Sequence, residues 1–187
     1  MSGRHEVEDL LNASAADILS AIHRGFRSVV DVKGKLAEYF LSQKLEELRK
    51  HRVIESVEWL DKDGQPDFFI RVGGRTLRVE CKNVRSGENG LYRNPKAYKV
   101  ELQKTRNSKD GTPTRGYRIE EFDVLAACLF NQTHEWEYLY IATRRLERRP
   151  GMTDFLVIMQ RVPLRAEGPW RADMEAAIRD ALGRHRG

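Results

Sequence analysis

The sequence predicts an α/β protein, a single mixed domain built around a central sheet. Two helical patterns, at residues 32–50 and 173–182, enclose several short segments in which apolar and polar residues alternate as in a strand. The chain of 187 residues is long enough for one domain with a buried core, and no repeat or Pro/Gly/Ser-rich linker divides it. A sheet covered by helices is an architecture that buries both kinds of apolar face.

Residues 5–24 are expected to form one or two short helices. Ser14 is followed three residues later by Asp17, a spacing that resembles a capping box with Asp in place of the usual Glu. Gly25 then marks the end of this helical segment. We therefore expect residues 1–30 to form a helical N-terminal extension.

The clearest helix is predicted at residues 32–50, with Asp31 as its N-cap. At about 100° per residue, its apolar side chains fill one half of the helical wheel. These side chains are Leu36, Ala37, Phe40, Leu41, Leu45 and Leu48. Glu38 falls at the edge of this apolar face, where its carboxylate can point toward a neighbouring sheet.

Strand patterns follow this helix. Val53–Leu60 is the first, and then Asp67–Val72 and Arg75–Val84 flank the two-residue turn Gly73-Gly74, which is typical of a hairpin. The polar, turn-rich residues 85–116 come next. Four further ordered segments are expected, namely a short piece at Tyr98–Arg106 and buried strands at Phe122–Phe130, Trp136–Thr143 and Phe155–Val162. The last helix is predicted at Asp173–Leu182.

The composition is that of a folded, water-soluble domain. Hydrophobic residues make up 40% and charged residues 33%. The longest apolar stretch, Val124–Phe130, is too short to cross a bilayer, and the first residues lack the apolar run of a secretory signal. The two cysteines, Cys81 and Cys128, do not suggest a disulfide framework, and a reducing, cytoplasmic location fits them.

Basic residues are concentrated in two places. Residues 93–118 carry eight Lys/Arg against two acids, and a second cluster consists of Arg144, Arg145, Arg148 and Arg149. The chain has a net charge of +5 and a pI near 9.3. Such stretches suit a polyanion, because neutralising phosphates releases counterions. The alternative is a solvated basic surface without a ligand.

One group of residues combines the right types and spacing for catalysis. Asp67 is separated by twelve residues from Glu80-Cys81-Lys82. If the hairpin pairs residue 72 with 75, Asp67 lies opposite Glu80 on one face, with Cβ atoms about 5 Å apart. Lys82 lies two residues further on the same face, within about 7 Å, while the Cys81 side chain points to the core.

This arrangement favours a metal site. Adjacent carboxylates repel unless a proton, a lysine or a metal lies between them. Asp67 and Glu80 are predicted metal ligands, with the backbone carbonyl of Cys81 as a third, and Glu38 completes the shell directly or through water. Lys82 then orients or deprotonates a bound water, or neutralises charge on a phosphate. The alternative is an exposed Glu80–Lys82 ion pair, which contributes little.

On these residues the chain resembles the PD-(D/E)XK nuclease superfamily, and in particular restriction-endonuclease-like proteins. The motif stands as Pro66-Asp67 and Glu80-Cys81-Lys82, preceded by the helix that carries Glu38. Gln103-Lys104-Thr105-Arg106 is similar to the polar motif that often follows the catalytic lysine, and residues 122–130 are similar to the next buried strand. The resemblance covers residues 30–145, which would form the nuclease core of a single domain spanning residues 1–187.

The resemblance implies a four- to five-stranded mixed sheet flanked by helices, hydrolysis of phosphodiester bonds, and dependence on Mg²⁺, with Mn²⁺ able to substitute. Asp67, Glu80 and Lys82 would be the catalytic residues. Candidate phosphate or DNA contacts are Gln103, Lys104, Arg106, Arg115 and Arg118. Tyr117, which lies between Arg115 and Arg118, could also contact DNA. Each of these residues has a plain alternative as a solvent-facing polar residue. Asp123, which opens an apolar strand, is expected to be a cap or the partner of an arginine.

The leading hypothesis is a metal-dependent DNA endonuclease, such as a type II restriction or host-defence enzyme. Cleavage of both strands by one site per chain predicts a homodimer, whose two-fold symmetry suits a palindromic site in duplex DNA. A structure-specific repair or junction nuclease would share the site. A non-catalytic DNA-binding or assembly module on the same scaffold is the alternative from another class.

Overall fold

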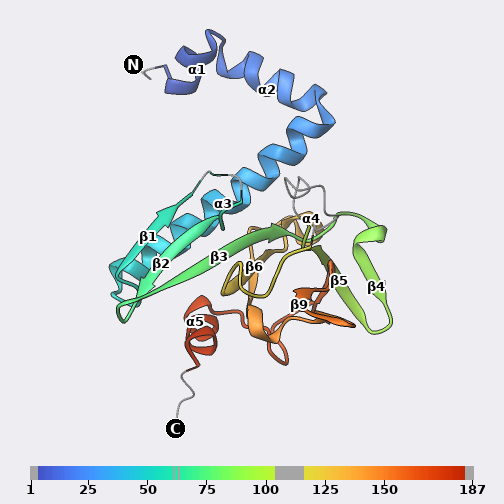
Figure 1. Ribbon diagram of the computed structural model, residues 1–187. Helices are drawn as coiled ribbons and strands as arrows, with labels where there is room; N and C mark the ends of the chain where they lie inside the picture. The colour runs from blue at the N-terminus through green and yellow to red at the C-terminus, as the bar shows by residue number, and fades with distance from the viewer. Residues whose placement is uncertain (1–3, 61, 63, 104–115, 184–187) are drawn as a thin grey trace. The chain divides into compact units, whose positions relative to one another are not determined.

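The computed structural model describes residues 4–60, 62, 64–103 and 116–183 (Figure 1). The chain divides into two compact units, Met1–Leu36 and Ala37–Gly187. The elements described in the first unit are all helices, whereas the second unit contains the sheets. Across the described ranges, no helix combines the length and apolar character needed to traverse a membrane.

The N-terminal helices begin and end largely where the sequence predicts. Helix α1 (Glu6–Leu11) is followed by α2 (Ala15–Arg24), and the Ser14 hydroxyl accepts a hydrogen bond from the Asp17 N–H at 3.2 Å. Gly25 follows α2 as predicted. Helix α3 (Phe26–Lys50), however, begins at once after this glycine, so the predicted start at Asp31 is wrong. Nothing between Phe26 and Asp31 breaks a helix, since this segment contains neither Gly nor Pro.

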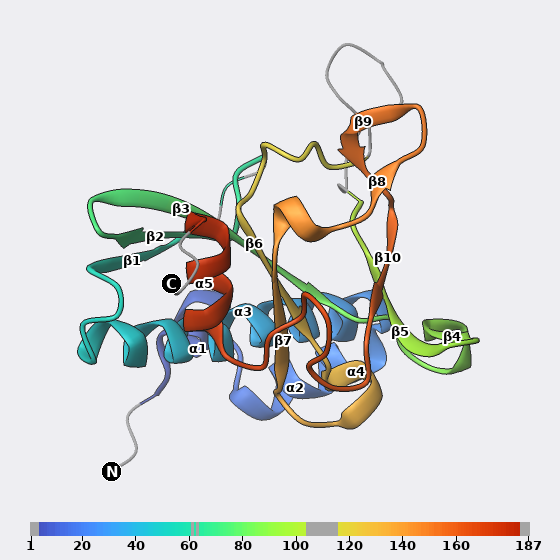
Figure 2. The same ribbon diagram turned by 90° about the horizontal axis from the view of Figure 1, so that it is seen from below.

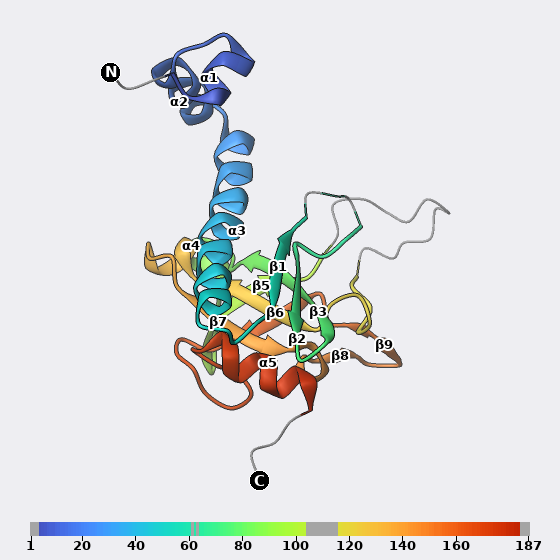
Figure 3. The ribbon, with the colours of Figure 1, turned by 90° about the vertical axis from the view of Figure 1, so that its left-hand side faces the viewer.

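The central sheet has five strands in the order β1-β2-β3-β6-β7, and α3 and α5 accompany it (Figures 1 and 3). Strands β3 and β6 are parallel and every other neighbouring pair is antiparallel, so the sheet is mixed. The strands are β1 (Ser56–Trp59), β2 (Phe68–Val72), β3 (Arg75–Asn83), β6 (Val124–Cys128) and β7 (Tyr138–Ala142). The predicted fold class, α/β with a central mixed sheet flanked by helices, is confirmed.

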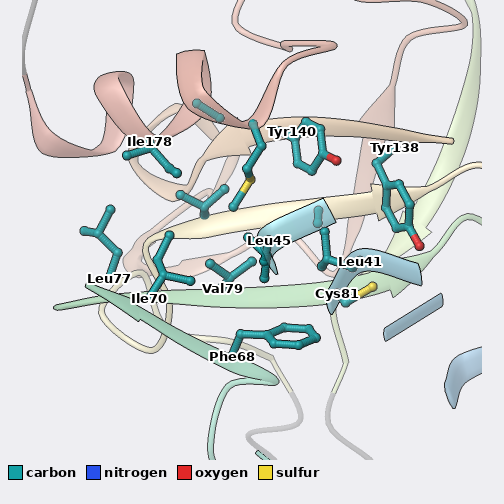
Figure 4. Packing of buried hydrophobic residues seen from close by; sticks show 14 of the residues in the cluster. Leu41, Leu45, Phe68, Ile70, Leu77, Val79, Cys81, Tyr138, Tyr140 and Ile178 are labelled. Atoms are coloured by element: carbon teal, nitrogen blue, oxygen red, sulfur yellow. The ribbon is translucent and has the colours of Figure 1, made fainter. Parts of the chain in front are cut away.

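Helices α3 and α5 (Met174–Leu182) cover one face of this sheet. The Asp173 carboxylate caps α5 by accepting hydrogen bonds from two backbone N–H groups of its first turn. Leu41 and Leu45 of α3 and Ile178 of α5 lie in one buried cluster with apolar side chains from the strands (Figure 4). From the strands come Phe68, Ile70, Leu77, Val79, Cys81, Val124, Ala126, Cys128, Tyr138 and Tyr140.

A second, three-stranded sheet in the order β10-β5-β4 contributes to the core on the opposite face. Val100 and Val162 of this sheet share a buried cluster with Leu125 and Ile141 of the central sheet. The strands are β4 (Leu91–Arg93), β5 (Lys96–Glu101) and β10 (Met159–Val162). Parallel β3 and β6 need a long crossover, and this crossover carries β4 and β5.

The single strand predicted at Phe155–Val162 is wrong, because this segment forms two strands. β9 (Met152–Leu156) pairs with β8 (Arg148–Arg149), whereas β10 pairs with β5 (Figure 2). The buried amide of Gln160 holds the chain where it changes sheet: its nitrogen donates to the carbonyls of Glu147 and Val157, and its oxygen accepts from the Glu147 N–H. These bonds satisfy backbone groups that a continuous strand would have paired in its ladder. The remaining short helices are η1 (Glu88–Gly90), α4 (Phe130–Thr133) and η2 (Thr143–Arg145).

Candidate active site

The hairpin β2–β3 brings Asp67 to Glu80 in the predicted register. Val72 pairs with Arg75 and Phe68 pairs with Val79, so the position before Phe68 continues opposite Glu80. Positive φ angles at both turn residues, 56° at Gly73 and 74° at Gly74, provide the tight turn. Asp67 itself precedes β2, and its Oδ2 accepts a hydrogen bond from the Cys81 N–H at 2.7 Å. This bond fixes the Asp67 carboxylate beside β3.

Glu80 is the buried carboxylate of the site, with 2% of its surface exposed. The Lys82 ammonium lies 2.6 Å from Glu80 Oε1. The Tyr117 hydroxyl donates to the same Oε1 at 2.5 Å. A surface ion pair between Glu80 and Lys82 is therefore the wrong interpretation: the carboxylate is held inside the protein by two donors, which offset the cost of removing it from water.

The charges of the site depend on one another. Burial raises the pKa of Asp67, and the nearby charge of Glu80 raises it further, to about 7 despite the opposing effects of Lys82 and the Cys81 N–H. Burial by itself would lower the pKa of Lys82, but the surrounding negative charge, chiefly that of Glu80, raises it overall. Lys82 is therefore an ammonium ion at neutral pH. Burial and the Glu80 charge also raise the pKa of Tyr117, which stays a neutral donor.

Sequence reasoning missed the role of Tyr117. Its backbone carbonyl accepts from the Leu156 N–H at 2.9 Å, and the neighbouring Ile119 N–H donates to Asp154 at 3.0 Å. These bonds attach residues 117–119, called here the Tyr117 segment, to β9. Its ring packs edge-on against Phe122 at 5.4 Å. The partnership with Glu80 joins residues 37 positions apart, and no local pattern marks it.

Glu38, the predicted second-rank ligand, accepts a hydrogen bond from the Trp59 indole N–H at 3.0 Å. The Trp59 ring in turn stacks on Phe68 with a centroid separation of 5.8 Å. The charge of Glu38 is close enough to contribute to the raised pKa of Asp67. Within the described ranges, no group of three or more His, Cys, Asp or Glu side chains is placed to hold a metal ion.

The donors nevertheless suit a magnesium ion. Mg²⁺ is commonly bound through one or two carboxylates, with waters and substrate phosphates as its other ligands. Asp67 and Glu80 are two such carboxylates, and their mutual repulsion is evident in the raised pKa of Asp67. The pair therefore fits the cation predicted from the sequence, and the charge of Glu38 acts on Asp67. The Cys81 side chain lies in the core, as predicted, and its N–H serves Asp67.

The predicted phosphate contacts are placed only in part. Gln103 forms an isolated bridge with Gly116, next to Tyr117. Arg118 is exposed, pairs with Glu120 at 3.6 Å, and places its guanidinium 4.8 Å from the centre of the Phe155 ring. Three further predicted contacts lie outside the described residues, namely Lys104, Arg106 and Arg115.

Asp123 has the structural role predicted for it. Its two carboxylate oxygens accept from Nε and Nη2 of Arg78 at 3.0 and 3.1 Å, and the Arg78 N–H donates to Oδ2 at 2.8 Å. The Asp123 N–H returns a bond to the Arg78 carbonyl at 2.8 Å. Such a bidentate pair fixes geometry, and here it lies beside the first parallel contact of the sheet, Val79 with Val124.

The second arginine cluster lies in η2 and in the hairpin β8–β9. The Arg149 guanidinium lies 5.8 Å from the centre of the Phe155 ring, which is also the ring that Arg118 contacts. A β-carbon added at Gly116 would come within 3.0 Å of Arg149 Nη2. The arginine-bearing hairpin therefore adjoins the segment that places Tyr117 on Glu80.

The chain matches no family model and no curated protein. Among solved structures, a bacterial homing endonuclease is similar to it, with 19% sequence identity and a TM-score of 0.42. The similarity covers 60% of this chain and 68% of that one. We draw no functional argument from a similarity of this size, and the assignment of a function depends on the site itself.

The raised pKa of Asp67 predicts that Asp67→Asn stabilises the protein at alkaline pH. An acid whose folded pKa of about 7 exceeds its unfolded value costs stability as the pH rises from about 4 through 7. Asn keeps an oxygen for the Cys81 N–H but never ionises. We expect a melting temperature at least about 2–4 °C above wild type at pH 8, the shift of roughly 1 kcal/mol in a domain of this size. The gain should shrink at pH 5, and an equal gain at both values would contradict the prediction.

Tyr117→Phe should destabilise the fold by about 1–3 kcal/mol, because it leaves the buried Glu80 carboxylate with one donor fewer. Urea denaturation measures this loss. Tyr39→Phe, at a site 46% exposed, is the matched control and should change stability by less than about 0.5 kcal/mol. In a Glu80→Gln background the cost of Tyr117→Phe should fall, and an undiminished cost would show that the hydroxyl acts elsewhere.

Proposed function

We propose that this protein is a metal-dependent endonuclease that hydrolyses phosphodiester bonds in DNA. The observation that carries the proposal is the buried Glu80 carboxylate, whose Oε1 lies 2.6 Å from the Lys82 ammonium. Its charge also contributes to the raised pKa of Asp67. Two carboxylates and a cation are the groups needed to bind Mg²⁺ and to stabilise negative charge on a phosphate. Asp67, Glu80 and Lys82 are the catalytic residues of this proposal.

Asp67 and Glu80 would hold the cation, with the Cys81 carbonyl and Glu38 as the proposed supporting ligands. A bound Mg²⁺ or Mn²⁺ supplies polarisation of the scissile phosphate and a lowered pKa for water. Asp67 is already fixed by the Cys81 N–H, and Tyr117 restrains Glu80, so both carboxylates are held in place before a ligand arrives. Such preorganisation reduces the reorganisation needed during the reaction.

Lys82 acts as a cation in this proposal. A general base must be able to accept a proton, and the raised pKa of Lys82 leaves it protonated at neutral pH. Its ammonium group is suited instead to orienting a water molecule or to neutralising the charge that develops on the phosphate. Glu80 keeps this group in position through the contact at 2.6 Å.

The basic hairpin supports DNA as the substrate. Arg148 is exposed, Arg149 is half-buried beside Phe155, and both lie on β8. A two-stranded ribbon fits the major groove of duplex DNA, and arginines bind its phosphates. The hairpin joins the site through the backbone bonds from β9 to the Tyr117 segment. Gln103, Lys104, Arg106, Arg115 and Arg118 are the further phosphate contacts of the proposal.

As a biological role we propose type II restriction or host defence, with a homodimer cutting both strands of duplex DNA. Discrete fragments from a long duplex would support this role. Preferential cutting of branched or nicked DNA would instead favour a repair or junction nuclease. Tight DNA binding in Mg²⁺ without scission would favour a non-catalytic module.

Lys82→Ala and Glu80→Gln should each lower DNA cleavage by about 100-fold or more, because the first removes the cation proposed to neutralise phosphate charge and the second removes a charged ligand of the proposed metal. The assay follows a long mixed-sequence duplex with Mg²⁺, Mn²⁺ or EDTA, and EDTA should abolish cleavage by the wild type. Lys50→Ala, which removes an exposed lysine on α3, is the control and should cleave normally. Circular dichroism verifies that each variant is folded. Wild-type rates in both site variants would refute the assignment.

Combined Arg148→Ala and Arg149→Ala substitutions should weaken DNA binding and flatten its salt dependence. Each lost phosphate contact lowers the slope of log K against log salt by about 0.9 in B-DNA. Fluorescence anisotropy with a labelled duplex in EDTA measures this slope without cleavage. Arg165→Ala removes an exposed arginine elsewhere and should leave the slope unchanged. Equal slopes for the wild type and the double variant would exclude the hairpin as a DNA contact.

A further inference from the structure

The helical arm, defined here as residues 4–36, contains no buried residue. It nevertheless carries seven of the eleven large hydrophobic side chains that are exposed in the described part of the chain. Leu10 is 81% exposed and Phe26 is 83% exposed. The seven are Val7, Leu10, Leu11, Leu19, Phe26, Val30 and Leu36. Such a concentration of exposed apolar side chains in one segment makes the arm a candidate interaction surface.

These side chains belong to helices that need a partner. Helix α1 has six residues and α2 has ten, and helices of such lengths are marginal in water without tertiary packing. Ile18 and Ile22 follow each other at helical spacing on α2, next to Leu19. A helix with one apolar side normally buries that side against another element. The arm therefore has the exposed apolar side chains and short helices expected of a segment that packs against a partner.

The charge of the arm indicates which partner fits. Residues 4–17 carry four acids against one arginine, whereas residues 24–35 carry four Lys/Arg against one acid. Two arms lying antiparallel would place the acidic end of each on the basic end of the other. A two-fold axis makes both contacts equivalent. A nucleic acid or an anionic membrane would be repelled by the acidic end.

We propose that the helical arm is a dimerisation element, which pairs antiparallel with the arm of a second copy of this chain. The apolar side chains of the two arms face each other, and the opposite charges at their ends set the direction of pairing. The proposal refines the homodimer of the proposed function. Because self-association is measured without DNA or metal, its outcome is independent of whether the protein is a nuclease.

Sedimentation equilibrium of the full chain tests the proposal. The wild type should be dimeric at micromolar concentration, and Leu19→Glu with Phe26→Glu should weaken the dimer at least about 100-fold, since buried charges in an interface are strongly unfavourable. Leu164→Glu, at a site 42% exposed outside the arm, is the matched control and should stay dimeric. A monomeric wild type, or a double variant that still dimerises, would overturn the proposal.

A charge-reversal series tests the antiparallel direction. Arg24→Glu with Arg27→Glu should weaken the dimer, because it places acidic residues opposite an acidic end. Adding Glu6→Lys and Asp9→Lys to the same chain should restore dimerisation, and high salt should reduce both effects. In a parallel pair the arginine reversals would exchange one like-charge contact for another and change little. Unaltered association in the arginine variant would therefore reject the antiparallel arrangement.

Discussion

The carboxylate of Glu80 is the group on which the site depends. A charge with 2% exposure is stable only when it is paired, and one oxygen, Oε1, receives both the Lys82 ammonium and the Tyr117 hydroxyl. Lys82 comes from the same strand, whereas Tyr117 comes from a segment fastened to β9. Neutralising one buried charge thus requires two separate parts of the chain to come together.

The mixed topology of the sheet explains how these parts meet. The antiparallel hairpin β2–β3 delivers Asp67 and Glu80 by a local connection. The parallel pairing of β3 with β6 then demands a long crossover, and Tyr117 lies in the described part of this crossover that returns to β6. The bidentate Arg78–Asp123 pair fixes the register at that return. The α3–α5 face, in contrast, supplies packing and contributes Glu38 at its edge.

The local parts of this arrangement were predictable and the long-range parts were not. Strand alternation and the Gly73-Gly74 turn predict the register that aligns Asp67 with Glu80 and the side of β3 that carries Lys82. The burial of Glu80 depends on Tyr117, and no period or spacing reports a contact across 37 positions. The early start of α3 has a local cause, because residues 26–31 contain no helix breaker. The division of residues 155–162 into two strands depends on the hydrogen bonds of the Gln160 amide, which local propensity does not report.

The position of Trp59 makes it a natural fluorescent probe of the candidate site. Its indole is 41% exposed, donates to Glu38 and stacks on Phe68, the residue that follows Asp67. The other two tryptophans lie elsewhere: Trp170 is 6% exposed and Trp136 stacks on Phe130. Because Trp59 is the most exposed of the three, we expect its emission to be the most red-shifted. Because its N–H bonds a carboxylate at the edge of the candidate site, the intrinsic fluorescence of the unmodified protein reports changes in charge there.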